Sequence, residues 1–324
     1  MFLYKSKGKR NPIYSKIKCI RAMTVLIHLF FCPRTAGATL KTGGIAMART
    51  KITPQEGLLS DLEYTSIIVS YSNGIDSTGA LYWALKHFPK EKIYLIYCDT
   101  GCEYPMNVEL FYRTAKFLEI KPVLLSDPRG FLGLLLNERL KFPDMRHRWC
   151  TSYLKTAVTD KWIRQHREQL GSKCLFLSGE RRDESTGRAK LPELEYHSTT
   201  LKTKRTGDFT CHWYRPCLDY QKGKMFEWGK ELHLEPHPCY EYIGRCSCMF
   251  CVLMPDKHAA ENIKRYPAIA AEYVRAEIKL QHTWKKARSL QNLFNECLDI
   301  DDIDEDLLED YRQISLFDVI DGQR

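Results

Sequence analysis

Short apolar runs alternate with segments of helical periodicity through the middle of the chain. Four apolar runs bounded by turn residues predict buried strands, at residues 67–69, 92–98, 122–126 and 174–177. Four segments with apolar positions at helical spacing predict helices, at residues 79–88, 108–118, 154–170 and 225–232. Because strand and helix alternate and βαβ connections are right-handed, this pattern predicts an α/β fold with a parallel sheet sandwiched between helices.

The two ends of the chain differ from this middle part. Residues 256–296 are helical in period, which predicts a helical extension after the sheet. Residues 1–46 hold nine Lys and Arg and no acidic residue, and residues 296–310 hold nine acidic residues and no base. The apolar segment 22–32 is too short to span a bilayer, so we expect no membrane attachment. Residues 1–46 fit three alternatives: a secretory signal, an organelle transit peptide, or an in-frame extension upstream of Met47 as the true start. We favour the extension.

Charge and cysteine content narrow the class of protein. The chain has 324 residues and a net charge of +9, which favours an anionic ligand such as a nucleotide or a nucleic acid. Its 13 cysteines show no repeating pattern, and four of them fall between Cys239 and Cys251. This spacing is atypical of a disulfide framework and predicts a metal site in a protein of a reducing compartment, the cytoplasm.

The turn after the first strand has the composition of a phosphate-binding loop. Ser72, Asn73 and Gly74 are small or turn-forming residues, and Asn tolerates left-handed backbone geometry. The first N–H groups of the following helix have no intrahelical acceptor and suit an anion, and hydroxyl groups add donors. The alternative is an ordinary capped turn. The candidate ligands are Ser70, Tyr71, Ser72, Asn73, Gly74, Asp76, Ser77 and Thr78.

Two further turns follow predicted strands and so fall at the same edge of the sheet. Asp99, Thr100 and Gly101 come after the second strand, where Asp99 can face a ribose, a metal ion or the substrate. A charged turn follows the fourth strand, and its arginines can bind phosphate or sulfate oxygens while Glu184 holds them in place. In isolation these segments also fit a plain turn and a solvated charged loop. The candidates in the charged turn are Gly179, Arg181, Glu184, Ser185 and Arg188.

The cysteine-rich segment 236–251 predicts a metal site. Cys248 and Cys251 have the spacing at which two sulfurs bind one metal, and Cys246 and Cys239 can add thiolates. Upstream, Cys150 lies among Arg146, His147 and Arg148, whose positive charge favours a thiolate. Cys150 and Cys239 both remain candidates for the fourth ligand. His237 is a weaker candidate, and zinc and an iron-sulfur cluster both accept four thiolates.

These motifs together resemble the phosphoadenosine phosphosulfate (PAPS) reductase family, including the related sulfur-transfer proteins of DNA phosphorothioation. The segment 72–77 is similar to the family's pyrophosphate loop (PP-loop), S-G-G-x-D-S, with Asn73 in place of the first glycine. Asp-Thr-Gly at 99–101, R-x-C-T at 148–151 and R-x-S-C-x2-C at 245–251 also match. The fixed positions of G-x-R-x-x-E-S-x-x-R are all present at 179–188. The resemblance covers residues 66–251.

The resemblance implies a fold of the adenine-nucleotide α-hydrolase (HUP) type. We therefore expect a nucleotide-binding α/β domain at residues 47–235 and a cysteine-cluster and helical region at 236–295. Charge separates from these a basic extension at 1–46 outside the fold and an acidic tail at 296–324. The resemblance also implies a 4Fe-4S cluster, to which zinc remains the alternative, and ATP or a sulfonucleotide (adenylyl sulfate or PAPS) bound with Mg²⁺. Asp76, Asp99, Arg181, Glu184 and Arg188 would be the catalytic residues.

Three functions fit these features. The first is ATP cleavage between the α- and β-phosphates with adenylylation of a substrate, linked to sulfur transfer onto an acceptor such as a nucleic acid. The second is reduction of adenylyl sulfate or PAPS to sulfite, for which the family has an E-C-G-L/I-H tail; Glu296-Cys297-Leu298-Asp299 lacks its glycine and histidine. The third is a non-catalytic nucleic-acid-binding module stabilised by zinc. We favour the first, with a sulfur or electron donor protein as a further partner.

Overall fold

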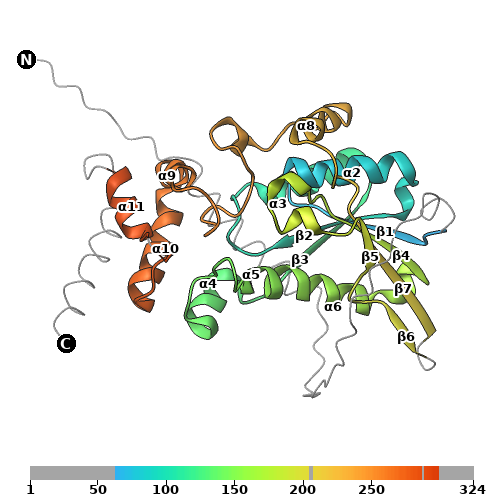
Figure 1. Ribbon diagram of the computed structural model, residues 1–324, viewed down its shortest axis with the longest axis horizontal. Helices are drawn as coiled ribbons and strands as arrows, with labels where there is room; N and C mark the ends of the chain where they lie inside the picture. The colour runs from blue at the N-terminus through green and yellow to red at the C-terminus, as the bar shows by residue number, and fades with distance from the viewer. Residues whose placement is uncertain (1–62, 204–206, 287, 299–324) are drawn as a thin grey trace, which may run out of the picture. The chain divides into compact units, whose positions relative to one another are not determined.

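The computed structural model describes residues 63–203, 207–286 and 288–298, so the predicted basic extension and nearly all of the acidic tail lie outside the described residues. A central sheet has the strand order β3-β2-β1-β4-β7-β5, with β6 paired to β7 (Figure 1). The five parallel strands are β1 (Ser66–Ser70), β2 (Ile93–Asp99), β3 (Lys121–Ser126), β4 (Lys173–Leu177) and β7 (Gly207–Tyr214).

The alternation of side chains along β1 explains why helices cover both faces of the sheet. Ile67, Ile68 and Val69 are fully buried, and successive side chains of a strand point to opposite faces. Ile67 and Val69 share a core with residues of α2 (Ile75–His87), α3 (Asn107–Leu118) and α8 (Lys222–Glu231). Ile68 packs on the other face with Ile163 of α6 (Ala157–Gln165). The predicted α/β/α sandwich is therefore confirmed (Figure 1).

The segment after residue 193 contains strands that the apolar pattern of the sequence does not predict. Residues 194–208 are polar and basic, a composition that predicts an exposed loop, and this prediction is wrong for the described residues. The structure forms β5 (Leu194–Tyr196) and β6 (Leu201–Thr203), both antiparallel to β7. Glu195 is buried because its carboxylate pairs with the guanidinium of Arg215 at 2.5 Å, which lets a charged residue occupy a strand in the protein interior.

The helical extension forms a core together with the cysteine-rich segment. It consists of α9 (Asp256–Arg265), α10 (Pro267–Leu280) and α11 (Leu290–Cys297). Tyr273 of α10 packs on Phe250 beside the cysteines and on Phe131 of α4 (Gly130–Leu134). The buried carboxylate of Glu277 accepts hydrogen bonds from backbone N–H groups of Leu290 and Gln291, both at 2.9 Å, and so fixes α11 on α10. The cysteines are thereby held against the edge of the α/β layer.

Short helical segments complete the described chain. They are α5 (Trp149–Thr151), α7 (Arg167–Leu170), η1 (Lys90–Lys92), η2 (Leu135–Arg139), η3 (Ser152–Thr156), η4 (Arg182–Glu184), η5 (Arg188–Lys190) and η6 (Pro238–Glu241). Among the described helices, none has the length and apolar character needed to cross a lipid bilayer.

Candidate functional site

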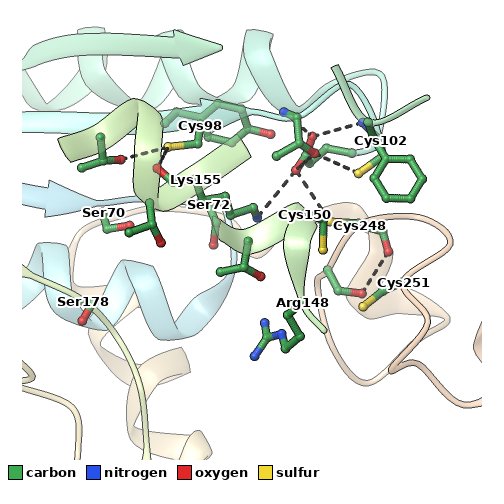
Figure 2. A pocket seen from close by; sticks show the side chains of 18 of the residues that line it. Ser70, Ser72, Cys98, Cys102, Arg148, Cys150, Lys155, Ser178, Cys248 and Cys251 are labelled. Atoms are coloured by element: carbon green, nitrogen blue, oxygen red, sulfur yellow. Dashed lines mark hydrogen bonds and ion pairs between the residues drawn. The ribbon is translucent and has the colours of Figure 1, made fainter. Parts of the chain in front are cut away.

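A cavity of about 390 Å³ lies at the carboxyl ends of the parallel strands, where α/β sheets bind their ligands. Ser70 at the end of β1, Cys98 near the end of β2 and Ser178 after β4 line one side of it. The opposite side comes from the segment around Cys150 and from residues 245–253 (Figure 2). Ser70, Tyr71 and Ser72 of the predicted phosphate loop (residues 70–78) therefore line the same cavity as cysteines that are far away in sequence.

The loop between β1 and α2 has the geometry expected of an anion site. Asn73 adopts the predicted left-handed conformation with φ of 58°, and its side-chain Nδ2 donates to the carbonyl of Asn107 at 2.8 Å. The N–H of Ile75 donates to the Tyr240 hydroxyl at 3.2 Å. The N–H groups of Gly74, Asp76 and Ser77 have no acceptor within the described part of the chain. Three backbone donors at the start of α2 are thus available to an anion.

The hydroxyl groups of this loop form hydrogen bonds within the loop itself. Ser77 Oγ donates to the carbonyl of Gly74 at 2.7 Å and accepts the N–H of Ser72 at 3.1 Å. Thr78 Oγ1 donates to the same carbonyl at 3.2 Å, and Ser72 Oγ bonds to Ser77 Oγ at 3.3 Å. All three hydroxyls therefore stabilise the turn itself, and the backbone N–H groups are the donors left for a phosphate.

The charged turn after β4 packs directly on the phosphate loop. Gly179 approaches the backbone of Asp76 and Ser77 so closely that a Cβ atom would overlap the Asp76 carbonyl. The buried Arg181 Nε donates to the Asp76 carboxylate at 2.7 Å, and its Nη1 reaches Asp183. The two loops consequently hold each other in position.

The other members of the charged turn form a second pair. Glu184 accepts a hydrogen bond from the Arg188 guanidinium and another from the N–H of Arg181 at 3.0 Å. Ser185 Oγ accepts the N–H of Arg188 at 3.2 Å. Arg188 lines the cavity and Glu184 does not, so Glu184 acts by holding the arginine that faces the cavity.

Burial and charge act in opposite directions on the central carboxylate. Burial raises the pKa of Asp76, and the hydrogen bond and positive charge of Arg181 partly offset this. For Arg181, burial acts to lower the pKa, but Asp76 outweighs it and the net pKa is raised. The ionised pair is thus maintained by mutual contact.

The turn after β2 brings an additional acidic residue into the site. Asp99 Oδ1 accepts the N–H of Gly101 at 2.9 Å, and Gly101 has a φ of 76° that suits glycine. Thr100 lines the cavity and donates through its hydroxyl to Glu103 at 2.7 Å. Glu103, which was not among the predicted site residues, also lies 3.7 Å from the ammonium of Lys155.

The five predicted cysteine ligands fall into two groups. Cys248 lies with Cys102 and Glu103, the ligand atoms of the three being within 4.8 Å of one another, and Cys150 and Cys251 line the same cavity. Cys239 and Cys246 lie with His237, again within 4.8 Å, although Cys246 also lines the cavity. The predicted ligands Cys246 and Cys248 thus fall in different groups, and of the two candidates for the fourth ligand, Cys150 lines the cavity and Cys239 lies with His237. Cys102 was missed, although its place directly after a strand-end turn could have revealed it.

Within the group of Cys102, Cys150, Cys248 and Cys251, the pKa of one thiol is lowered, that of Cys248. A hydrogen bond with Cys248 and burial raise the pKa of Cys102, and burial raises the pKa of Cys150 and of Cys251. A hydrogen bond from Cys102 and the positive charge of Lys155 hold the pKa of the Cys248 thiol below its usual range. Burial acts to lower the pKa of Lys155, but the negative charges of Cys248 and Glu103 outweigh it and raise that pKa. Ionisation is therefore favoured most at Cys248, and Lys155 is the cation beside it in Figure 2.

Comparison with known families identifies the domain that carries this site. Residues 66–251 match the phosphoadenosine phosphosulfate reductase domain. The chain belongs to this family. The match begins at β1 and ends at Cys251, so the family domain includes the phosphate loop, the charged turn and both cysteine groups. As a member of this PP-loop family, the chain is related to enzymes that bind adenine nucleotides.

Three solved structures have a low similarity to the chain. A phosphoadenylyl-sulfate reductase from Candida auris in a phosphate complex is 14% identical, with a TM-score of 0.38, 59% of this chain covered and 84% of the other. An NH3-dependent NAD synthetase from Campylobacter jejuni in complex with nitrate is 13% identical, with a TM-score of 0.36 and coverages of 74% and 88%. The U34-tRNA thiolase NcsA from Methanococcus maripaludis with its 4Fe-4S cluster is 12% identical, with a TM-score of 0.37 and coverages of 71% and 80%. No curated protein matches the sequence.

Proposed function

We propose that this chain binds ATP at the loop after β1 and uses it to activate a substrate oxygen for replacement by sulfur. The oxygen attacks the α-phosphorus, the bond between the α- and β-phosphates breaks, and pyrophosphate leaves. A sulfur nucleophile then takes the place of the adenylylated oxygen, which departs with AMP. The net charge of +9 supports an anionic acceptor, and a nucleic acid is the acceptor class that we favour.

The observation that carries this proposal is the shared cavity. The phosphate loop contributes Ser70, Tyr71 and Ser72 to its lining, and the opposite side contributes cysteines. Arg148, Lys155, Arg188 and Arg245 line it as well and supply positive charge for phosphate oxygens. Activation of an oxygen and delivery of sulfur can therefore occur at one place.

The cavity cysteines have the donor set of an iron-sulfur site. Six cysteines line the cavity: Cys98, Cys102, Cys150, Cys246, Cys248 and Cys251. The Cys98 thiol lies 3.3 Å from the Thr159 hydroxyl, and Cys246 lies with His237 and Cys239, which leaves Cys102, Cys150, Cys248 and Cys251. Four thiolates suit a 4Fe-4S cluster as well as zinc. We infer that these four residues hold the cluster and that Cys102 is the fourth ligand. When bound, the cluster supplies single-electron transfer. Lys155 offsets part of the negative charge of the thiolates.

The carboxylates nearest the phosphate loop already have protein partners. Asp76 pairs with Arg181, and Asp99 accepts the N–H of Gly101. Mg²⁺ in nucleotide sites commonly keeps several waters and binds through substrate phosphates and one or two carboxylates. We infer that Mg²⁺ arrives with ATP and that the half-buried Asp99 is the carboxylate that approaches it.

The position of Cys297 favours ATP cleavage over sulfonucleotide reduction. Reduction of adenylyl sulfate or PAPS requires a cysteine that attacks the sulfur, and the sequence offers Cys297 for this task. Cys297 is the last residue of α11 and packs against the core of the helical extension. The residues that line the described cavity do not include it.

Product analysis with the full chain, purified without oxygen, tests the proposal. The protein is incubated with ATP, Mg²⁺, sulfide as the sulfur nucleophile and single- or double-stranded nucleic acid. We expect AMP and pyrophosphate, together with sulfur in the nucleic acid. Formation of ADP and phosphate, or nucleic-acid binding that ATP does not alter and that yields no AMP, would contradict the proposal. Release of sulfite from adenylyl sulfate would instead establish the reductase reaction.

A further inference from the structure

Besides Cys102, Cys150, Cys248 and Cys251, a second group of metal-binding side chains consists of His237, Cys239 and Cys246, of which Cys246 also lines the cavity. One ligand atom of each lies within 4.8 Å of the other two. His237 and Cys239 are buried, and Cys246 is half-buried. His237 and Cys239 flank the start of η6, and Cys246 follows the turn at Gly244. We propose that this group is a second metal site, which binds one zinc ion.

The hydrogen bonds of His237 leave one ring nitrogen, Nδ1, unprotonated and so able to bind a metal. The N–H of Cys239 can only donate, and it donates to His237 Nδ1 at 3.1 Å. In the neutral ring the proton is therefore on Nε2, which donates to Asn107 Oδ1 at 2.8 Å. A metal-binding histidine commonly donates its other N–H to an oxygen in this way, which fixes the ring orientation. Nδ1 would then bind the ion in place of the Cys239 N–H.

The chemistry of the group selects the kind of metal. Two thiolates and one imidazole suit Zn²⁺, which binds sulfur and nitrogen ligands in tetrahedral geometry. With three protein ligands, the fourth position is left for water. The set offers too few thiolates for a cluster of the four-cysteine type. It is therefore chemically distinct from the group of Cys102, Cys150, Cys248 and Cys251, which offers four thiols.

The proposed zinc site lies directly against the phosphate loop. A Cβ atom on Gly74 would be 3.6 Å from Cβ of Cys246 and 3.7 Å from the Tyr240 hydroxyl. Asn107, which holds the His237 ring, also accepts the side-chain hydrogen bond of Asn73. A zinc ion would thus cross-link His237, Cys239 and Cys246 next to the phosphate loop. It would thereby stabilise the left-handed turn at Asn73.

Metal analysis of the full chain tests the second site. Protein purified without oxygen should contain about one zinc per chain in addition to the iron of the cavity site. Cys239→Ser and the less buried Cys246→Ser should each remove the zinc and retain the iron. Cys251→Ser should remove the iron and retain the zinc, and Cys297→Ser, at the half-buried end of α11, should retain both. Zinc-depleted protein should bind one Co²⁺ with the visible absorption of a tetrahedral thiolate complex, and Cys246→Ser should not.

Each contrary result identifies which of the two metal assignments is wrong. Absence of zinc together with absence of Co²⁺ binding would overturn the second site. Loss of iron and zinc together in Cys239→Ser and Cys246→Ser would show a single site, and loss of zinc in Cys251→Ser would place the zinc in the cavity. A protein without iron, whose zinc is lost only in the Cys239 and Cys246 variants, would refute the cluster assignment and retain the second site. Cys246→Ser provides the result if Cys239→Ser fails to fold.

Discussion

Replacement of Gly179 by alanine is expected to weaken ATP binding at least about tenfold. The added Cβ would overlap the carbonyl oxygen of Asp76 and would lie 2.8 Å from the backbone nitrogen of Ser77. Backbone atoms cannot rotate away as a side chain can, so the phosphate loop itself must shift. The N–H groups of Gly74, Asp76 and Ser77 would then no longer converge on one anion. Overpacking of this kind also destabilises a protein by about 1–3 kcal/mol.

Gly187→Ala is the matched control for this experiment, because it lies in the same charged turn. The nearest atom to a Cβ at Gly187 is the Ser185 hydroxyl oxygen, at 4.0 Å. We expect a change in the free energy of unfolding below about 0.5 kcal/mol and unchanged ATP affinity. Calorimetric titration with ATP and thermal unfolding measure both variants. Equal ATP affinity in Gly179→Ala and Gly187→Ala would show that the contact between the two loops does not shape the nucleotide site.

Replacement of Arg181 by alanine is expected to have the largest effect on stability. The Arg181 side chain is 6% exposed and pairs with Asp76 and Asp183. Its removal leaves the Asp76 carboxylate, which is 29% exposed, without the counter-ion that donates a hydrogen bond to it. Breaking a buried pair in this way costs about 3 kcal/mol or more. The same change removes the contact that holds the charged turn on the phosphate loop, so turnover with ATP should fall with stability.

Arg129→Ala is the matched control, since Arg129 also pairs with two carboxylates, Asp127 and Glu138, but is 41% exposed. Exposed pairs contribute about 1 kcal/mol or less, and we expect a loss in this range. The loss in Arg181→Ala should also depend on pH. Burial raises the pKa of Asp76. Without Arg181 that pKa rises further, so the penalty is present at neutral pH and diminishes as the pH falls and Asp76 takes up a proton.

Denaturant unfolding of both variants at neutral and acidic pH measures these differences. A loss below about 1 kcal/mol in Arg181→Ala at neutral pH, equal to that of Arg129→Ala, would contradict the role of the pair. A loss that grows toward acidic pH would contradict the assignment of the unpaired charge to Asp76.

The parallel sheet and the phosphate loop could be predicted from the sequence because local chemistry determines both. Ile67, Ile68 and Val69 favour a buried strand in any context that buries both faces of a sheet. Asn73 is one of the few residues other than glycine that adopt positive φ at modest cost, and it does so here. The strands after residue 193 depend instead on a distant partner. Glu195 becomes compatible with a buried strand only through Arg215, and sequence periodicity does not reveal such a pair.

The division of the cysteines could not be predicted for a similar reason. Spacing along the chain shows which sulfurs are able to reach a common metal, and Cys246, Cys248 and Cys251 all satisfy that condition. The direction of each side chain depends on the fold. Cys246 lies with Cys239 and His237, whereas Cys248, two residues later, lies with Cys102. Cys102 itself is brought to the site by β2, far away in sequence.

Equilibrium binding of adenine nucleotides to the full chain tests the central claim most directly. The claim is that the loop after β1 holds the phosphates of an adenine nucleotide through the N–H groups at the start of α2. We predict that ATP with Mg²⁺ binds at least about tenfold more tightly than adenosine, because adenosine has no phosphate oxygens to accept hydrogen bonds from those N–H groups. Equal affinity for ATP and adenosine, or no measurable binding of ATP, would contradict the account.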